Sequence, residues 1–319
     1  MERILTMLLG GETLSGESMA RELGVTRAAV FKHIEQLRAL GFEIESLARQ
    51  GYHLVSCPDS LMAPVVAHGL DTDWAGREIV YYPETDSTNR RARMLAQENA
   101  AHGTLVLADS QTAGRGRRGR GWISPAGEGI FMSLLLRPQV HPSQVAKLSL
   151  LTAFAVAEAI ERETGLDARI KWPNDIVIEG RKVCGLLLEM TADESTVHDV
   201  VAGVGINVHQ KTFDPEIAHT ASSLDLLSGK TVSRAALVRA FLAAFEEAMA
   251  LGDSEMMRRY LARSATVGQR VQVIALSGTF TGVAKGVTDS GSLLVEDEEG
   301  AVREVLAADV SVRGIMGYV

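Results

Sequence analysis

The hydrophobic pattern of this 319-residue chain changes twice, and these changes limit the folds that it can adopt. In the first 60 residues, apolar side chains recur with helical spacing in short blocks. From residue 79 to about residue 263, β-like runs alternate with helical stretches, and from residue 267 strand-like alternation continues alone. The β-like runs lie at 79–82, 104–108, 130–137, 168–171, 176–178, 183–190 and 197–204, and the helical stretches near 89–98, 142–164 and 234–251. The pattern predicts an α+β multidomain protein with domains at 1–60, 61–264 and 265–319. The last domain is expected to be a small SH3-like β-barrel.

The first 60 residues read as a winged helix-turn-helix domain. Its three helical blocks are Glu2–Leu9, Ser15–Leu23 and Thr26–Leu40. Gly24 can end the second helix and Thr26 can cap the third, so the connection between them is a tight turn. Two alternating runs, at 42–47 and 51–55, predict a small β-hairpin after the helices.

The third helical block carries the candidate DNA contacts. One of its faces is apolar, and we expect Thr26, Arg27, Lys32 and His33 to face a DNA groove. Residues 1–60 hold six Lys and Arg against eight Asp and Glu, so a helical oligomerisation or regulatory cap is the alternative. We favour DNA binding because the distribution of charge on one helix matters more than the sum.

Composition limits the class and compartment of the protein. A net charge of −8 argues against a surface that coats nucleic acid but allows one local DNA-reading element. The longest apolar stretch, Leu148–Ile160, falls short of the roughly 20 residues that cross a bilayer. The first ten residues do not resemble a secretory signal, and Cys57 and Cys184 are the two cysteines. We therefore expect a cytoplasmic protein with reduced thiols, no contact with membranes and no permanent metal site.

The segment Gly114–Gly121 is the strongest anomaly, with four arginines and four glycines in eight residues. Glycine lets backbone N–H groups approach an anion closely, and arginine offers planar, permanently charged donors that match phosphate oxygens. A disordered RGG-type nucleic-acid segment is the alternative. We favour a small-molecule phosphate site, because the segment lies between β-like runs and leads into Trp122.

A second set of chemical groups is formed by Lys171–Asp175 and Arg181–Glu189. The turn at Glu179-Gly180 predicts a hairpin that returns Lys182 toward Asn174 and Asp175. A cation, an amide and a carboxylate at one spot suit a magnesium nucleotide, with Lys182 on the reacting phosphate. For Arg181 we expect a surface ion pair, and Trp172 and Cys184 are expected in the core.

Two further motifs are weak by themselves. Ser87, Thr88 and Asn89 stand at the predicted start of a helix, where small polar residues are first of all a cap. The segment Gly203–Asn207 ends a predicted strand with two glycines and an amide, which is not a specific signal alone.

Together, in this order, the motifs resemble biotin protein ligases over essentially the whole chain. The strings Gly-Arg-Gly-Arg-Arg-Gly-Arg and Lys-Trp-Pro-Asn-Asp are the specific ones, and the helix-turn-helix in front is similar to that of the subclass that also represses the biotin operon. The resemblance implies a central core of the biotin/lipoate ligase type. It implies biotin contacts by Ser87, Thr88, Asn89, Gln111, Arg115, Gly116, Arg117, Lys182, Gly185 and Gly205. It implies ATP contacts by Arg117, Arg120, Trp122, Asn174, Asp175, Lys182, Asn207 and, in the last domain, Arg313.

The resemblance also implies the reaction and the partners. Biotin and ATP with Mg²⁺ would be the substrates, and Lys182 and Asp175 the catalytic residues. Biotinyl-AMP would pass its biotin to a lysine of a biotin carboxyl carrier protein, and an adenylate-bound homodimer would bind operator DNA. Three alternatives stay open: a ligase with a non-regulatory N-terminal domain, a lipoate-type ligase, and a biotin-sensing repressor without turnover.

Overall fold

The computed structural model describes residues 1–275, 278–307 and 310–314 of the chain. It divides into two compact units, one formed by Met1–Asp71 with Ser233–Arg239 and the other by Thr72–Val232 with Ala240–Val319. The three-domain boundaries at 60/61 and 264/265 stay predictions.

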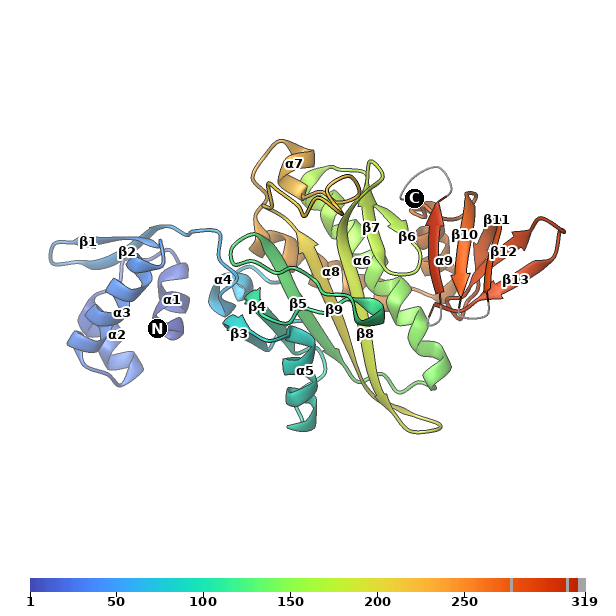
Figure 1. Ribbon diagram of the computed structural model, residues 1–319. Helices are drawn as coiled ribbons and strands as arrows, with labels where there is room; N and C mark the ends of the chain where they lie inside the picture. Colours follow the sequence, from blue (N-terminus) through green and yellow to red (C-terminus); the bar gives the residue numbers. More distant parts are fainter. Residues whose placement is uncertain (276–277, 308–309, 315–319) are drawn as a thin grey trace. The chain divides into compact units, whose positions relative to one another are not determined.

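The first unit contains the predicted winged helix-turn-helix (Figure 1). Its elements are α1 (Glu2–Leu9), α2 (Gly16–Leu23), α3 (Arg27–Ala39), β1 (Glu43–Leu47), β2 (Gly51–Ser56) and α4 (Ala63–Ala67). The turn between α2 and α3 forms as the capping residues predict. Gly24 adopts φ +66° at the end of α2, and the Thr26 hydroxyl accepts a hydrogen bond from Ala29 N–H at 3.2 Å. Val30, Ile34 and Leu37 bury one face of α3.

The second unit is built on a seven-stranded sheet in the order β3-β4-β5-β9-β8-β7-β6. The strands are β3 (Ile79–Thr85), β4 (Leu105–Gln111), β5 (Gly129–Leu136), β6 (Arg169–Lys171), β7 (Asp175–Ile178), β8 (Arg181–Ala192) and β9 (Val197–Asn207). The pair β3/β4 is parallel and the other neighbours are antiparallel. Each strand overlaps a predicted β-like run, so the expectation of a mixed core is confirmed.

Helix α5 (Thr88–Gln97) packs on β4, β5 and β9, and helix α6 (Val145–Thr164) packs on β6 to β9 (Figure 1). The other helices are α7 (Leu224–Ser228), α8 (Arg234–Met249), whose first residues belong to the first unit, and α9 (Asp253–Ala262), with short 3₁₀ turns η1 (Arg117–Gly119) and η2 (Pro142–Gln144). The stretch Pro142–Thr164 is the one described helix long and apolar enough to cross a membrane by length and composition. Since 61% of its most apolar window is buried inside the protein, it also satisfies the pattern of a core helix.

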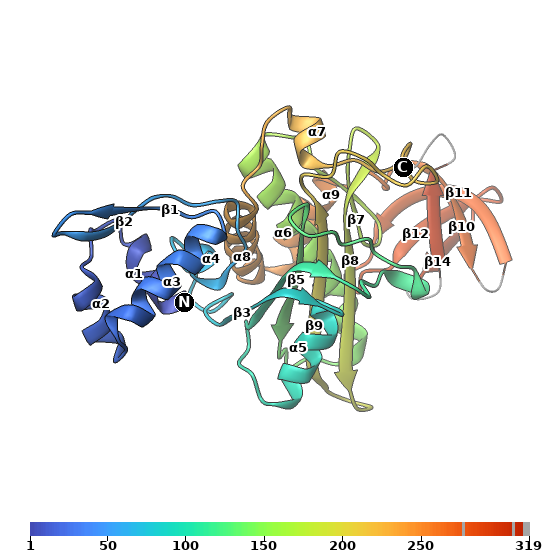
Figure 2. The same cartoon turned by 60° about the vertical axis from the view of Figure 1, so that its left-hand side comes forward.

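The chain from Arg270 onward forms a five-stranded antiparallel sheet, ordered β13-β12-β11-β10-β14 (Figure 2). Its strands are β10 (Arg270–Ala275), β11 (Gly278–Val287), β12 (Leu293–Asp297), β13 (Val302–Val305) and β14 (Val310–Gly314). No α-helix occurs in the described residues from Arg270 onward, which agrees with the predicted small all-β domain. Trp172 is buried and donates its indole N–H to the carbonyl of Gly291 at 3.0 Å, which confirms its place in the core.

Candidate functional site

One cavity of about 1200 Å³ in the second unit brings together nearly all the residues that the motifs single out. Its lining includes Ser87, Thr88, Asn89, Gln111, Arg115, Gly116, Arg117, Arg120, Trp122, Asn174, Asp175, Lys182, Gly185, Gly205 and Asn207. The side chain of Arg313, the remaining predicted contact, lies outside the described residues. Motifs that are distant in the chain thus converge on one site.

Glycines on neighbouring strands form part of the cavity wall. Gly185 of β8 pairs with Gly205 of β9, and both lie against the indole of Trp122. A Cβ on Gly205 would approach Trp122 Nε1 to 2.6 Å, and a Cβ on Gly185 would approach the same ring to 2.9 Å. The two positions therefore exclude side chains so that Trp122 can lie on the sheet, which explains the second glycine of the Gly203–Asn207 segment.

The Ser-Thr-Asn motif opens α5 beside this wall, but its hydroxyls do not cap the helix. Ser87 occupies the N-cap position without a side-chain capping bond, whereas Thr88 N–H donates to Gln111 Oε1 of β4 at 2.8 Å. Ser133 of β5 donates to Asn89 Oδ1 at 2.6 Å, and all of Ser87, Thr88 and Asn89 are buried. The interpretation of these hydroxyls as a helix cap is thus wrong in detail, because the side chain of Gln111 on β4 accepts the free N–H group at the start of α5.

Asn89 crosses from α5 to the centre of the sheet. Its amide donates to the Leu187 carbonyl at 3.1 Å and to Glu189 Oε2 at 2.9 Å. A Cβ on Gly203 would meet Asn89 Oδ1 at 2.1 Å, so glycine is required there for the asparagine to reach β8. Asn89 therefore holds α5 against three strands in addition to lining the cavity.

Asp86 precedes the motif and is held as a carboxylate. Burial alone would raise its pKa, but the Ser87 N–H, the Thr85 hydroxyl and the charges of Arg91 and Arg90 together lower it below its usual value. The negative charge is thus fixed at the start of α5, where the helix dipole favours it.

Lys182 and Asp175 are joined by the β7–β8 hairpin, as the turn at Glu179-Gly180 predicts. Lys182 Nζ lies 2.6 Å from Asp175 Oδ1 and 5.3 Å from the centre of the Trp122 ring. The backbone of Lys182 is held as well, since its N–H donates to the Thr220 carbonyl at 2.7 Å and its carbonyl accepts from Ser222 N–H at 2.9 Å. Backbone hydrogen bonds therefore fix the main chain of Lys182, and Asp175 holds its ammonium group in the cavity.

Arg117 is the most enclosed arginine of the Gly-Arg segment, and Arg115, Arg118 and Arg120 are exposed. Its guanidinium donates to Asn174 Oδ1 at 3.0 Å and to the Ala307 carbonyl. Burial lowers the pKa of Arg117, and the charge of Asp175 opposes that shift. Because an arginine stays charged in a protein, this half-buried cation favours the arrival of an anion.

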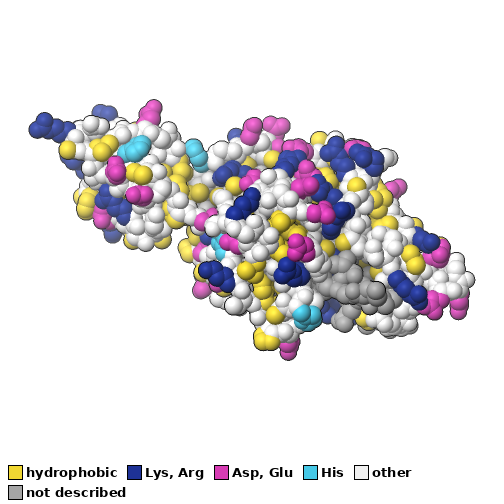
Figure 3. Space-filling view, turned by 90° about the horizontal axis from the view of Figure 1, so that it is seen from above, with side chains coloured by type: hydrophobic (Ala, Val, Ile, Leu, Met, Phe, Trp, Pro, Cys, Tyr) yellow, Lys and Arg dark blue, Asp and Glu magenta, His cyan; other side chains and the backbone are white. Residues whose placement is uncertain are grey.

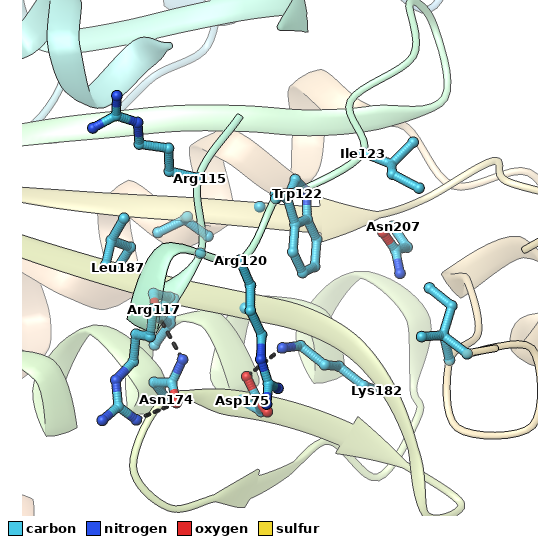
Figure 4. A pocket seen from close by; sticks show the side chains of 18 of the residues that line it. Arg115, Arg117, Arg120, Trp122, Ile123, Asn174, Asp175, Lys182, Leu187 and Asn207 are labelled. Atoms are coloured by element: carbon cyan, nitrogen blue, oxygen red, sulfur yellow. Dashed lines mark hydrogen bonds and ion pairs between the residues drawn. The ribbon is translucent and has the colours of Figure 1, made fainter. Parts of the chain in front are cut away.

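Figure 4 shows how the charged groups are directed. Arg120 and Lys182 extend toward Asp175, Arg117 extends to Asn174, and Arg115 points away from them. Trp122 stands between this polar group and Asn207. The buried Nε1 of Trp122 has no hydrogen-bond partner among the described residues, so it is a donor available to a ligand.

Sequence reasoning missed the segment that forms another wall, residues 210–221. Its members in the cavity lining are Gln210, Thr212, Phe213, Asp214, Glu216, Ile217, His219, Thr220 and Ala221. Asn207 donates to the carbonyl of Ser222, the residue that follows this segment, at 3.1 Å. Gln210 is 4% exposed, and its Oε1 is buried without a hydrogen-bond partner among the described residues. The segment shows no helical or strand periodicity. Its position directly after the Gly203–Asn207 motif is the one feature of the sequence that could have indicated its place in the site.

Cys184 is buried in β8, and its burial raises the pKa of the thiol far above the usual range. This agrees with the expectation that Cys184 is a core residue and not a nucleophile.

Within the described residues, no group of three or more His, Cys, Asp or Glu side chains could hold a metal ion. Figure 3 shows acidic and basic side chains interleaved over the visible surface, without a large field of one sign.

The predicted DNA contacts lie on α3 in the first unit. Arg27 and Lys32 are exposed, and neither forms an ion pair with a described residue. His33 is half-buried, and its Nδ1 lies 2.8 Å from Gln36 Oε1. Thr26 caps the helix, as described above, so its hydroxyl already has a structural task.

Comparisons with known proteins agree with this arrangement. Family models match an HTH domain at residues 1–53, the biotin/lipoate A/B protein ligase family at 81–207, and the biotin protein ligase C-terminal domain at 266–313. The bifunctional ligase/repressor BirA of Bacillus subtilis is 40% identical over 307 residues, covering 94% of each chain. That of Escherichia coli is 30% identical and covers 98% of this chain and 96% of its own.

A solved structure is also similar. The biotin protein ligase from Aquifex aeolicus in complex with biotin and ATP superposes with a TM-score of 0.62 at 32% identity, covering 75% of this chain and 99% of its own. The fold and the site define a protein ligase of the biotin/lipoate type that carries a helix-turn-helix domain. Since its relatives match along nearly the whole chain, this chain belongs to the family of bifunctional biotin ligase/repressors.

Proposed function

We propose that the chain activates biotin with ATP to form biotinyl-5'-AMP and transfers the biotin to a lysine of a biotin carboxyl carrier protein. The observation that supports this most directly is that two polar pairs line one cavity together with Ser87, Thr88 and Asn89. The pairs are Lys182 with Asp175 and Arg117 with Asn174. Similar proteins are named for this activity, and one solved relative holds biotin and ATP.

In this proposal, Lys182 lowers the repulsion between two anions. The biotin carboxylate attacks the α-phosphate of ATP, and pyrophosphate leaves with Mg²⁺, which enters with the nucleotide as substrate. As the substrates bind, before the attack, Lys182 exchanges its contact with Asp175 for contacts with the carboxylate and the phosphate. Because this exchange takes place on binding, the charge is already in position when the transition state forms and stabilises it without further reorganisation.

The arginine segment supplies further positive charge. Arg115 and Arg120 are exposed and can turn toward a phosphate, while Arg117 is already enclosed beside Asn174. Ser87, Thr88, Asn89 and Gln111 offer hydroxyl and amide groups suited to the polar ureido ring of biotin, and Gly116, Gly185 and Gly205 leave room for close approach.

The second half of the reaction needs a neutral amine on the carrier. A lysine has a reference pKa of about 10.4, so only a small fraction is neutral at pH 7. Asp175 is our candidate for assisting its deprotonation, because the carboxylate would be released when Lys182 turns to the adenylate. No covalent enzyme nucleophile is needed.

An exchange assay tests the ligase proposal. With purified full-length protein, radioactive pyrophosphate should enter ATP only when biotin is present, and addition of a carrier domain should yield biotinylated carrier. Exchange that depends on lipoate instead of biotin would identify the lipoate-type alternative. Binding of biotin without any exchange would identify the non-catalytic sensor.

We further propose that the first unit binds operator DNA as part of a homodimer formed by the adenylate-bound protein, in the cytoplasm where ATP and the operator are both present. Arg27 and Lys32 on the capped helix α3 are exposed and form no ion pair within the described part of the chain, which supports the DNA contact. One helix-turn-helix contacts few base pairs, so a dimer on two half-sites supplies the specificity. The proposal includes no membrane partner.

A further inference from the structure

Phe31 occupies the outer face of α3, where a large apolar side chain has no evident structural task. Its side chain is 55% exposed, although Val30, Ile34 and Leu37 bury the opposite face of the same helix. Ala28, one turn earlier, is also exposed, so the two residues form a small apolar surface. A single exposed apolar residue needs no explanation, and the argument therefore depends on what surrounds Phe31.

The surroundings of Phe31 are basic. Arg27 precedes it by one helical turn and Lys32 follows it directly, and both side chains lack an ion pair among the described residues. The acidic residue of this face, Glu35, is paired with Arg38 at 2.6 Å. An occupant of this face must therefore offer negative charge at its edges and an apolar group at its centre.

Duplex DNA in the major groove has this combination. Phosphates line the groove, and among the base edges the thymine C5-methyl group is the apolar one, which phenylalanine can contact. Phe31 lies in the early part of a helix that follows a helix-turn-helix turn, the part that meets base edges in this motif. This step rests on the proposed DNA binding and deepens it.

We propose that Phe31 reads sequence by packing against the methyl group of a thymine, while Arg27 and Lys32 position the helix on the flanking phosphates. Phe31 then confers specificity, whereas the two cations contribute affinity that does not depend on sequence. An acidic protein partner is the competing occupant, and the experiment separates the two.

The test uses the full-length protein with biotin and ATP. Binding duplexes are first selected from a random-sequence library with the wild-type protein, and each thymine of a selected duplex is then replaced in turn by uracil, which lacks only the methyl group. We expect the affinity of the wild type to fall about three- to fivefold at one or more positions. Phe31→Ala should bind the thymine duplex about tenfold more weakly and show no further loss with uracil at those positions.

Matched variants control for folding and charge. Phe31→Leu should keep the thymine preference, and Lys32→Ala should weaken binding to both duplexes by the same factor, with a shallower salt dependence. Carrier biotinylation and the helical circular dichroism signal should stay unchanged in every variant. An equal thymine-to-uracil ratio in wild type and Phe31→Ala overturns this inference alone, as does unchanged DNA binding by Phe31→Ala. A wild type that selects no duplex overturns the DNA-binding proposal as well.

Discussion

Lys182 and Asp175 face each other across the β7–β8 hairpin, with the lysine Nζ 2.6 Å from the aspartate Oδ1. Their side chains are 25% and 15% exposed, so the pair is enclosed but remains reachable from the cavity. An incoming carboxylate or phosphate competes with Asp175 for the ammonium group. The pair thus holds the charge in place before the substrates arrive.

Lys182→Ala should reduce biotin-dependent pyrophosphate exchange by about 10²- to 10³-fold, because the cation that stabilises the transition state is removed. Arg181→Ala is the matched control, since Arg181 lies next in the chain and pairs with Glu179 on the surface. The control should retain full exchange, and neither change should lower the melting temperature as a core mutation would. Undiminished exchange in Lys182→Ala would refute the role assigned to this lysine.

Gly205→Ala should displace Trp122 from the cavity wall, because the new methyl group would lie 2.6 Å from the indole nitrogen. Crowding of this kind costs about 1–3 kcal/mol, and the exchange rate should fall with it. Gly252→Ala is the control, since its added methyl meets no atom within 4 Å. Tryptophan fluorescence and exchange kinetics would report the change, and a variant identical to wild type in both would show that Trp122 does not need this surface.

The Gly114–Gly121 segment should be cut quickly by trypsin in the empty protein and become protected with biotin and ATP. Arg118 is exposed and has a left-handed φ of 56°, and a glycine-rich segment loses much entropy when it is ordered. Cleavage after Arg115, Arg118 and Arg120 should slow most, because Arg117 is already enclosed. Equal cleavage rates with and without both ligands would contradict ordering by the substrates.

Glu246→Gln should lower the free energy of unfolding of the second unit by about 1 kcal/mol, a value that includes the screening of a partly exposed carboxylate by solvent. The reason is that the Glu246 carboxylate accepts hydrogen bonds from the N–H groups of Asp73, Trp74 and Ala75. Burial alone would raise the pKa of Glu246, but these hydrogen bonds lower it. A carboxyl pKa lowered by folding adds stability above its unfolded pKa, near 4.5, and that stability is lost as the pH falls through the lower folded value.

The measurement is thermal unfolding of wild type and Glu246→Gln from pH 7 down to pH 3. The difference in melting temperature should be largest near neutral pH and shrink in acid. Glu247→Gln, next along α8 and paired on the surface with Arg162, should have a smaller effect. A difference independent of pH would mean that the charge of Glu246 contributes nothing.

Biotin with ATP should raise the dimer fraction in sedimentation and strengthen operator binding at fixed salt. If the adenylate favours the dimer, thermodynamic linkage requires the dimer to favour the adenylate by the same factor. Arg27→Ala combined with Lys32→Ala should weaken operator binding and leave ligation intact. An equal dimer fraction with and without ligands, or unchanged DNA affinity in the double variant, would leave the first unit as a cap on a ligase.

Much of the fold could be predicted because apolar periodicity and capping residues act locally. Ser15, Gly24 and Thr26 mark the helix ends that form, and the seven core strands lie where β-like runs occur. The helix Asp253–Ala262 was not predicted, because its many charged residues obscure the apolar pattern, although Met256 and Tyr260 bury one face. The segment 210–221 has no pattern of its own, so its place in the cavity wall could not be predicted.

By itself, the sequence determined most of the elements, the tight turn between α2 and α3 and the hairpin that brings Lys182 to Asp175, since these depend on neighbours a few residues apart. The tertiary structure alone decided the contacts between distant segments. Arg117 and Asn174 are 57 residues apart, and Asn89 reaches Gly203 only because β9 lies between β5 and β8. Strand order depends on the burial of the whole sheet, and so the cavity exists only once all of its strands have packed together.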